Sequence, residues 1–279
     1  MISEFDVNLP DGGVVHGYDT GPADSRLTVV WHHGTPNIGT PPEPLFEESQ
    51  QLGIRWVSYD RPGYGGSSPR PGRDVASAAA DVSAVVDALG IGRFAVLGHS
   101  GGGPHALACA ALLGDRVLGA VSGAGLAPLS AEGLDWFAGM AAGSEAGLRA
   151  AAAGRAAKAE YEAHAEFGAD SFTAADYAAL EGRWSWFNSV VSPAVADGPG
   201  PLIDDDLAYV GAWGFDPAAV SVPTQFLHGE HDRMVPSAHS RWLAGRVPHA
   251  RLQLVPAAGH ISVLDSAGEA LRFLAEFRS

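Results

Sequence analysis

Basic residues are scarce in this sequence. Lys158 is its only lysine, and 17 lysine and arginine residues stand against 32 aspartate and glutamate residues, for a formal net charge of −15 at pH 7. A protein that binds a phosphate backbone or an anionic membrane relies on clustered lysine and arginine. The charge balance therefore argues against nucleic acids and membrane surfaces as partners.

Cysteine and long hydrophobic runs are also lacking. Cys109 is the only cysteine, so an internal disulfide is excluded and we expect this side chain to lie in the core. No apolar run reaches the length of about 18 residues that a membrane-spanning helix needs. The first ten residues, MISEFDVNLP, resemble no secretion signal. We therefore expect a protein without membrane insertion and, most simply, a cytoplasmic one.

The chain alternates between short apolar, β-branched runs and helix-like segments. This alternation predicts an α/β fold, in which β-α-β units build a mostly parallel sheet covered by helices on both faces. Ligands bind at the carboxyl ends of the strands in such sheets. The expected strands are 14–18, 27–32, 54–59, 94–97, 117–121, 224–228 and 252–255. The expected helices are 44–52, 75–89, 104–113, 237–246 and 267–277.

One interval, residues 128–216, contains no convincing strand. It is too long for a plain loop, so we expect a helical insertion that divides the core into residues 1–127 and 217–279. The interval holds 12 of the 24 aromatic residues, and 14 acidic residues against 4 basic ones. This composition predicts a lid with an apolar underside and an acidic outer face.

The stretch Gly98-His99-Ser100-Gly101-Gly102 fits the pattern G-x-S-x-G. The pattern alone is weak in a glycine-rich chain, but here it joins an expected strand to an expected helix. A strand that turns sharply into a helix holds a serine hydroxyl clear of its neighbours at the positive end of the helix. We therefore predict that Ser100 is a nucleophile.

A serine nucleophile needs a base and a group that orients the base. His260 follows the last expected strand in the loop VPAAGHIS, where an imidazole has room to move. Asp232 follows the strand that ends near His228, although Glu230 lies only two residues away. The order Ser100, Asp232, His260 is the order found in α/β-hydrolases.

The oxyanion of an acyl-transfer reaction needs hydrogen-bond donors. An early strand ends in His33-Gly34-Thr35-Pro36, and proline has no N–H to offer. We therefore expect one donor to be the N–H of Thr35, with Gly34 as the alternative, and the second donor to be the N–H of Gly101.

Five motifs together resemble the α/β-hydrolases with a helical cap, and they cover nearly the whole chain. They are HHGTP for the oxyanion loop, YDRPGYGGSS for a second loop, GHSGGG for the nucleophile, HGEHDRMVP for the acid and AAGH for the base. The resemblance implies an eight-stranded sheet, a cap inserted after the sixth strand and a Ser-His-Asp site beneath it. Residues 128–216 fall where that cap belongs.

The motifs also depart from parts of that family. Gly101 stands where many relatives have a larger residue, which predicts a roomier or more mobile pocket floor. The oxyanion loop reads HGTP, not the HGGP of proline iminopeptidases. Ser100 replaces the aspartate of epoxide hydrolases and haloalkane dehalogenases, so these activities are disfavoured.

Several residues near the predicted site carry further expectations. Substrate contacts are expected at Gly34, His99, Trp184, Trp186, Phe187 and Trp213. Asp204, Asp205 and Asp206 are expected at a solvated helix start. His228 and His231 lack a second ligand pair at metal-binding spacing, so we expect no metal site.

These observations predict a serine hydrolase that cleaves a carboxylic ester or lactone of a small apolar or aromatic substrate, without a metal or organic cofactor. Thioester release, cleavage of C–C bonds in diketones, perhydrolysis and another hydrolytic reaction of specialised metabolism use the same triad and stay open. A small-molecule sensor with slow turnover is a further alternative. The oligomeric state, monomer or homodimer, is also open.

Overall fold

The computed structural model describes residues 2–22, 25–166 and 168–277. One sheet holds eight strands in the order β1-β2-β4-β3-β5-β6-β7-β8. The β1–β2 and β2–β4 pairs are antiparallel, and the other pairs are parallel. The strands are β1 Ser3–Asn8, β2 Val14–Asp19, β3 Leu27–His32, β4 Ile54–Tyr59, β5 Phe94–His99, β6 Val117–Gly123, β7 Thr224–Gly229 and β8 Ala250–Val255. The predicted α/β fold with a mostly parallel, eight-stranded sheet is confirmed.

Strand β1 is absent from the strands that the apolar runs predict. Its sequence, SEFDVN, alternates polar and apolar residues, and most of its side chains are at least partly exposed because it pairs with one neighbour at the sheet edge. The Phe5 ring lies over Gly17 of β2 and fills the space that a side chain at position 17 would occupy. The strand is therefore held by pairing and by this one ring more than by burial of an apolar run.

The predicted helices are present, with ends that differ by a few residues. The 44–52 segment begins as the 3₁₀ turn η1 and continues as α1. The α-helices are α1 Phe46–Leu52, α2 Ser77–Ala88, α3 Gly102–Leu112, α4 Ala142–Ala152, α5 Arg155–Glu162, α6 Ala174–Glu181, α7 Phe187–Ala194, α8 Gly200–Val210, α9 Ala238–Ala244 and α10 Ala267–Ala275. The 3₁₀ helices are η1 Glu43–Leu45, η2 Arg183–Trp186, η3 Pro217–Ala219 and η4 Ser262–Ser266.

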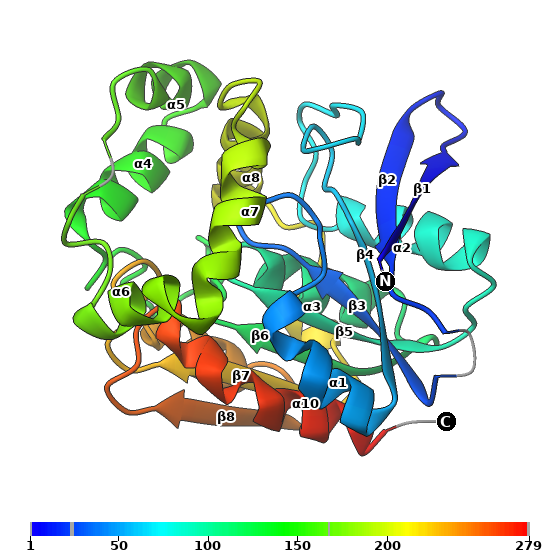
Figure 1. Cartoon of the computed structure of the whole chain (residues 1–279). Coiled ribbons are helices and arrows are strands. Elements are labelled where there is room, and N and C mark those ends of the chain that lie inside the picture. The colour runs from blue at the N-terminus through cyan, green and yellow to red at the C-terminus, as the bar shows by residue number, and fades with distance from the viewer. Residues whose placement is uncertain (1, 23–24, 167, 278–279) are drawn as a thin grey trace.

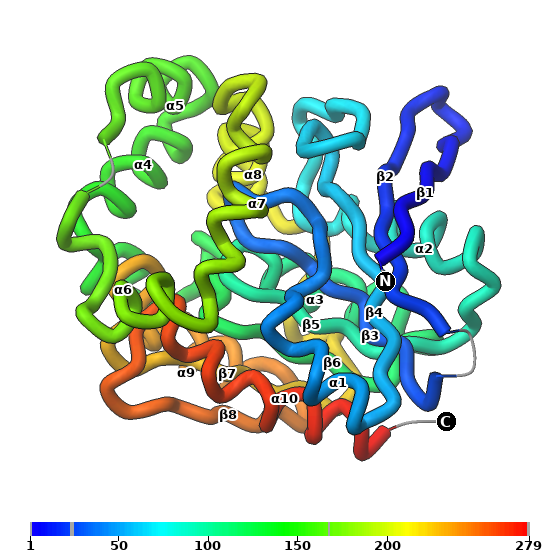
Figure 2. The backbone as a smooth tube through the Cα atoms, in the orientation of Figure 1, coloured from blue at the N-terminus to red at the C-terminus, as the bar shows by residue number. Residues whose placement is uncertain are grey.

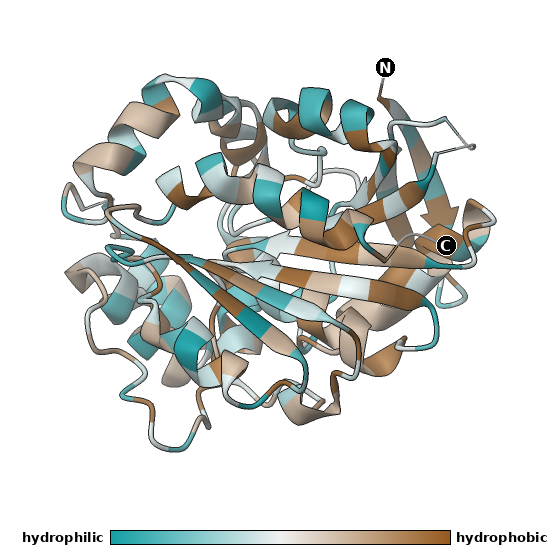
Figure 3. Ribbon diagram, turned by 90° about the horizontal axis from the view of Figure 1, so that it is seen from below, coloured by the Kyte–Doolittle hydropathy of each residue, from teal (hydrophilic) through white to brown (hydrophobic). Residues whose placement is uncertain are grey.

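The two faces of the sheet bury two separate sets of apolar side chains. Successive strand residues point to opposite faces, so Val96 of β5 packs with residues of α2, α3 and α9, while Leu97 packs with residues of α10. Figure 3 shows the sheet between these helix layers, with hydrophobic residues on its central strands. Figure 2 shows α10 beside α1 on one face. Cys109 is buried in α3, as expected.

Helices α4 to α8 all lie between β6 and β7 in the chain, within residues 128–216, which we call the insert segment. Figure 1 shows these helices gathered on one side of the molecule, in green and yellow. The insert segment is thus helical where a helical insertion was expected. Its role as a lid and its limits as a domain stay predictions.

One expectation for the insert segment is wrong. Asp204 and Asp205 were expected at a solvated helix start, but they lie in the middle of α8 and are buried. The reason is that both carboxylates are paired, Asp204 with Arg155 of α5 and Asp205 with Arg61 and Arg73 from a distant part of the chain. Burial of a carboxylate is tolerated when it is paired.

In the described part of the chain, every helix falls short of the length and hydrophobicity that crossing a bilayer would require.

Candidate active site

Ser100 lies at a sharp turn between β5 and α3. It is one of the few non-glycine residues with a positive φ, at 55°. The turn brings strand and helix so close that a side chain at Gly98 would overlap the backbone of Gly102, and one at Gly102 would overlap the backbone of His32. Glycine is required at both positions for this approach. The local geometry is that of a nucleophile elbow, with the strained residue at its tip.

A chain of hydrogen bonds joins the three side chains expected to form the triad. His260 Nδ1 lies 2.7 Å from Asp232 Oδ2, and His260 Nε2 lies 2.9 Å from Ser100 Oγ. A carboxylate only accepts, so Nδ1 carries the proton and Nε2 accepts from the serine hydroxyl. The structure thus brings together Ser100, His260 and Asp232, which are far apart in the sequence.

Asp232 is held ionised in a buried position. Its Oδ1 accepts from the N–H groups of Met234 and Val235, each at 2.9 Å, and His228 Nε2 lies 3.2 Å from Oδ2. Burial acts to raise the pKa of Asp232, but the charge of His260 and hydrogen bonds from His228 and His260 outweigh it and hold the pKa well below its ordinary value. The neighbouring Glu230 is exposed and faces Arg241 instead. Asp232, not Glu230, therefore contacts His260.

The loop that carries His260 is held from the other side by Asp176 of α6. Oδ1 of Asp176 accepts from the N–H groups of Ile261 and Ser262, at 2.8 and 2.9 Å. Burial acts to lower the pKa of His260, but Asp232, with a smaller contribution from Asp176, outweighs burial and raises the pKa above its ordinary value. Sequence reasoning missed Asp176, because the pattern Thr173-x-x-Asp176 signals a helix start and nothing more.

His99 also helps to hold His260, the expected base, in position. Its Nε2 donates to the main-chain carbonyl of His260 at 2.9 Å. Burial, with the neighbouring His260, lowers the pKa of His99 to about 3, so the ring is neutral. The Phe187 ring packs against it with centroids 5.9 Å apart, and Trp186 packs against Phe187 at 5.1 Å. These two aromatic residues therefore lie close to the candidate triad.

The two remaining tryptophans predicted as substrate contacts are buried far from one another. Trp184 donates its Nε1 hydrogen to Asp265 at 2.9 Å, in the same apolar cluster as Phe187. Trp213 donates to the carbonyl of Tyr209 at 3.1 Å and belongs to the cluster on the opposite face of the sheet. The structure does not bring all four aromatic residues to one place, and their contact with substrate stays a prediction.

Gly34 and Thr35 of the oxyanion loop lie beside the elbow. A Cβ atom on Gly34 would contact Ser100 Cβ at 3.6 Å. A side chain on Gly101 would overlap the Tyr209 hydroxyl and lie 2.6 Å from Thr35 Oγ1. The expectation of a roomier pocket floor at Gly101 is therefore wrong, because Tyr209 and Thr35 fill the space that a larger residue would take.

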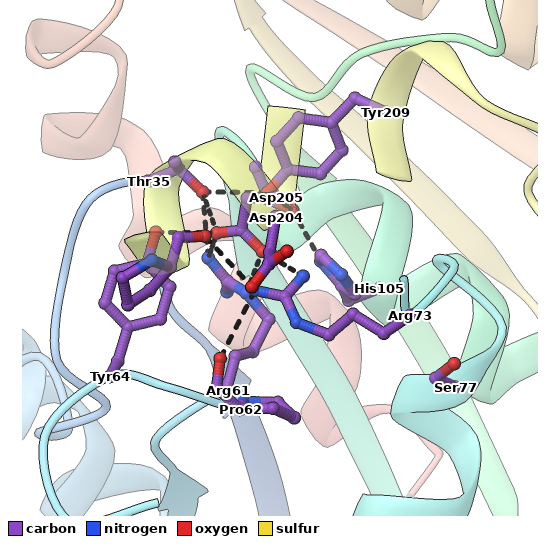
Figure 4. A network of polar contacts seen from close by, with 12 residues as sticks. Thr35, Arg61, Pro62, Tyr64, Arg73, Ser77, His105, Asp204, Asp205 and Tyr209 are labelled. Carbon is purple, nitrogen blue, oxygen red and sulfur yellow. Dashed lines mark hydrogen bonds and ion pairs between the residues drawn. The ribbon is translucent and has the colours of Figure 1, made fainter. Parts of the chain in front are cut away.

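A buried charge cluster, formed by Arg61, Arg73 and Asp205, contacts the oxyanion loop through the bond from Arg61 to the Gly34 carbonyl (Figure 4). The Asp205 carboxylate of α8, with 0% of its area exposed, pairs with Arg61 at 2.7 Å and Arg73 at 2.8 Å. Arg61 also donates to the carbonyl groups of His33 and Gly34. Burial acts to raise the pKa of Asp205, but the two arginines hold it well below its ordinary value. The cluster thus ties the insert segment to the oxyanion loop.

Among the described residues, no group of three or more His, Cys, Asp and Glu side chains is arranged to hold a metal ion. His228 Nδ1 accepts from the Ser240 hydroxyl at 2.6 Å, and its Nε2 donates to the Val235 carbonyl at 2.7 Å. Both of its ring nitrogens thus have protein partners, one on α9 and one in the loop that carries Asp232.

Comparison with known proteins identifies the family. The model of the alpha/beta hydrolase fold matches residues 28–267. The chain therefore belongs to the alpha/beta hydrolase fold family. It is an enzyme of this family.

The chain is also similar to individual proteins in sequence or in structure. The chain is 30% identical to a non-heme chloroperoxidase from Burkholderia pyrrocinia over 240 residues, which cover 83% of this chain and 84% of that one. A non-heme chloroperoxidase from Streptomyces lividans is 37% identical, over 35% of each chain. The structure of the enol-lactonase from Burkholderia xenovorans LB400 superposes with a TM-score of 0.70 at 20% identity and covers 99% of each chain. Because the identity is only 20%, this structural similarity shows a shared fold and nothing about activity.

Proposed function

We propose that the protein is a serine hydrolase that cleaves a carboxylic ester or lactone through an acyl-enzyme on Ser100. The observation that carries this proposal is the hydrogen-bond chain from Ser100 through His260 to Asp232, at 2.9 and 2.7 Å. A nucleophile, a base and a buried carboxylate in this order are the parts that acyl transfer requires.

The proposed reaction has two steps. Ser100 Oγ attacks the ester carbonyl while His260 Nε2 takes its proton, and the N–H groups of Thr35 and Gly101 bind the oxyanion that forms. His260 then gives the proton to the leaving alkoxide. A water molecule, deprotonated by His260, then attacks the acyl-enzyme. The bond between the acyl carbon and Ser100 Oγ breaks, His260 returns the proton to Oγ, and the acid leaves. Asp232 stabilises the imidazolium that forms in each step.

The substrate proposed is small and apolar or aromatic in the part that lies near Ser100. Phe187 and Trp186 support this choice, because the Phe187 ring packs against His99, which bonds to the His260 carbonyl, and the Trp186 ring packs against Phe187. Aromatic side chains offer large apolar surfaces to such groups. The protein is proposed to act without a metal or organic cofactor.

The experiment that tests this function combines turnover with labelling. The enzyme is assayed with p-nitrophenyl esters from C2 to C12, and a fluorophosphonate probe is mapped to its peptide. We expect saturable hydrolysis, strongest for the short acyl groups of the series, and a label on Ser100. The absence of both turnover and labelling would contradict the proposal and favour a small-molecule sensor with slow turnover. Labelling without ester turnover would move the search to diketones and thioesters.

A second candidate activity is perhydrolysis, favoured by the 34% identity, over 125 residues, to a bifunctional esterase/perhydrolase from Acinetobacter calcoaceticus. Hydrogen peroxide would replace water in the second step: the peroxide oxygen attacks the acyl-enzyme, His260 takes the proton, and a peracid leaves as Ser100 is regenerated. Peracid formation from ester and hydrogen peroxide, lost when Ser100 is replaced, would support it. Unchanged carboxylic acid as the sole product would exclude it.

The pH dependence follows from His260. The base must be neutral to accept a proton, and its pKa is raised above the ordinary value of 6.5. We therefore expect kcat/KM to fall as the pH drops through a midpoint above 6.5. Asp232 stays ionised throughout, since its pKa is lowered. Initial rates from pH 5 to 9 measure the midpoint, and a flat profile down to pH 5 would contradict His260 as the base.

A further inference from the structure

We propose that Tyr209 is a positioning residue of the oxyanion site: its hydroxyl group holds together the two main-chain segments, at Thr35 and Gly101, whose N–H groups bind the oxyanion. This inference rests on the proposed function and adds a residue from the insert segment to it. Tyr209 belongs to α8, whereas the two segments follow β3 and β5.

The hydroxyl of Tyr209 lies between the two segments. It is 2.8 Å from Thr35 Oγ1 and 3.1 Å from the carbonyl oxygen of Gly101. The Thr35 hydroxyl donates to Asp205, so the single hydrogen of the Tyr209 hydroxyl is shared between Thr35 Oγ1 and the Gly101 carbonyl in a three-centre hydrogen bond. The side chain is almost wholly buried, with 2% of its area exposed. A side chain at Gly101 would overlap the same hydroxyl. Gly101 and Tyr209 are thus fitted to each other, which explains why the residue after the serine is a glycine here.

The position of this hydroxyl is fixed by the charge cluster behind it. Thr35 Oγ1 donates to Asp205 at 2.6 Å and accepts from Arg61 at 2.9 Å. Asp205 precedes Tyr209 by four residues on α8, so both side chains lie on one face of the helix. Figure 4 shows Tyr209, Asp205 and Thr35 turned toward one another. Burial raises the pKa of Tyr209 above its ordinary value, so the hydroxyl stays protonated.

This arrangement matters because an oxyanion site works through donors that are already in place. Removing one donor costs roughly 10²- to 10³-fold in kcat. Tyr209 does not bind the oxyanion itself but holds the segments that carry the two donors. His105 Nδ1 also donates to the Gly101 carbonyl, at 2.7 Å, and keeps this bond when the Tyr209 hydroxyl is removed. We therefore expect a smaller loss when the hydroxyl is removed.

The test is Tyr209→Phe, which removes one oxygen and keeps the ring. We expect kcat for a p-nitrophenyl ester to fall about 10- to 100-fold with KM nearly unchanged. Affinity for an aryl boronic acid, which forms a tetrahedral adduct on Ser100, should fall by a similar factor. The matched control is Tyr161→Phe, since Tyr161 also lies in the insert segment and donates to a main-chain carbonyl, that of Gly143, at 2.9 Å. The control should keep wild-type kcat.

A second variant tests whether the two hydroxyl groups act together. Thr35→Val removes the other hydroxyl of the contact and keeps the size of the side chain, but it also removes the bonds of Thr35 to Asp205 and Arg61, so Tm is measured beside kcat. If the two hydroxyl groups act as a unit, the double variant should lose little more kcat than the worse single variant. Losses that simply multiply would contradict the inference.

The outcomes separate this inference from the proposed function. A wild-type enzyme with neither ester turnover nor a fluorophosphonate label on Ser100 would overturn both. An active, labelled wild type whose Tyr209→Phe variant keeps kcat and boronic acid affinity within twofold would overturn only the role of Tyr209. A loss confined to KM, or a fall in Tm with unchanged kcat, would assign Tyr209 to packing and overturn it as well.

Discussion

Replacing Ser100 with alanine is expected to lower kcat for ester hydrolysis by about 10⁴-fold or more, because the remaining groups have no nucleophile to activate. The fold should persist. The hydroxyl contributes one partly buried hydrogen bond, to His260, which is worth about 1 kcal/mol. The measurement compares kcat and Tm of wild type and Ser100→Ala at pH 7.5.

The control for this experiment is Ser83→Ala on α2, where a half-buried serine hydroxyl donates to Asp87 and accepts from Arg116, each at 3.3 Å. It removes the same atom far from the triad, and we expect wild-type kcat. Ser100→Ala with full activity would remove Ser100 from the mechanism. Loss of activity together with loss of the cooperative thermal transition would show that the serine supports the fold instead.

The second large effect is on stability and concerns Asp205. Asp205→Ala leaves the Arg61 and Arg73 guanidinium groups buried without this carboxylate, and we expect a loss of about 3–5 kcal/mol. For a chain of this size that corresponds to a fall in Tm of roughly 10 °C. Asp205 is wholly buried and pairs with both arginines within 2.8 Å, so solvent screens these contacts little.

The adjacent residue of α8 supplies a matched control. Asp206 pairs with Lys158 at 2.6 Å, but Lys158 also pairs with Glu162 at 2.6 Å and keeps that partner when Asp206 is removed. Asp206→Ala should therefore destabilise much less than Asp205→Ala. Thermal unfolding of the three proteins under one set of conditions decides the matter. Equal Tm values for both variants would contradict a special role for Asp205.

The parts of the site that sequence reasoning located share a local signal. Ser100 follows a strand and precedes glycines, and Asp232 and His260 each follow a strand. Parallel strands place their carboxyl ends at one edge of the sheet, so such residues meet without knowledge of any tertiary contact. The observed hydrogen bonds among the three agree with that expectation, and their catalytic role stays a proposal.

The residues that sequence reasoning missed depend on partners far along the chain. Asp205 resembles any acidic residue near a helix start until Arg61, 144 residues earlier, is seen beside it. Asp176 likewise serves a loop 85 residues later. Charge and periodicity describe one segment at a time, so they could not show that these carboxylates are buried.

The hydrogen bonds of Asp176 have a consequence for protein engineering. Chimeras that exchange the helical insert between relatives are an obvious route to new specificity. In this chain such a transplant would also remove the acceptor of the Ile261 and Ser262 N–H groups and the carboxylate between Arg61 and Arg73. A donor segment must therefore bring counterparts of Asp176 and Asp205, or the recipient must be redesigned to do without them.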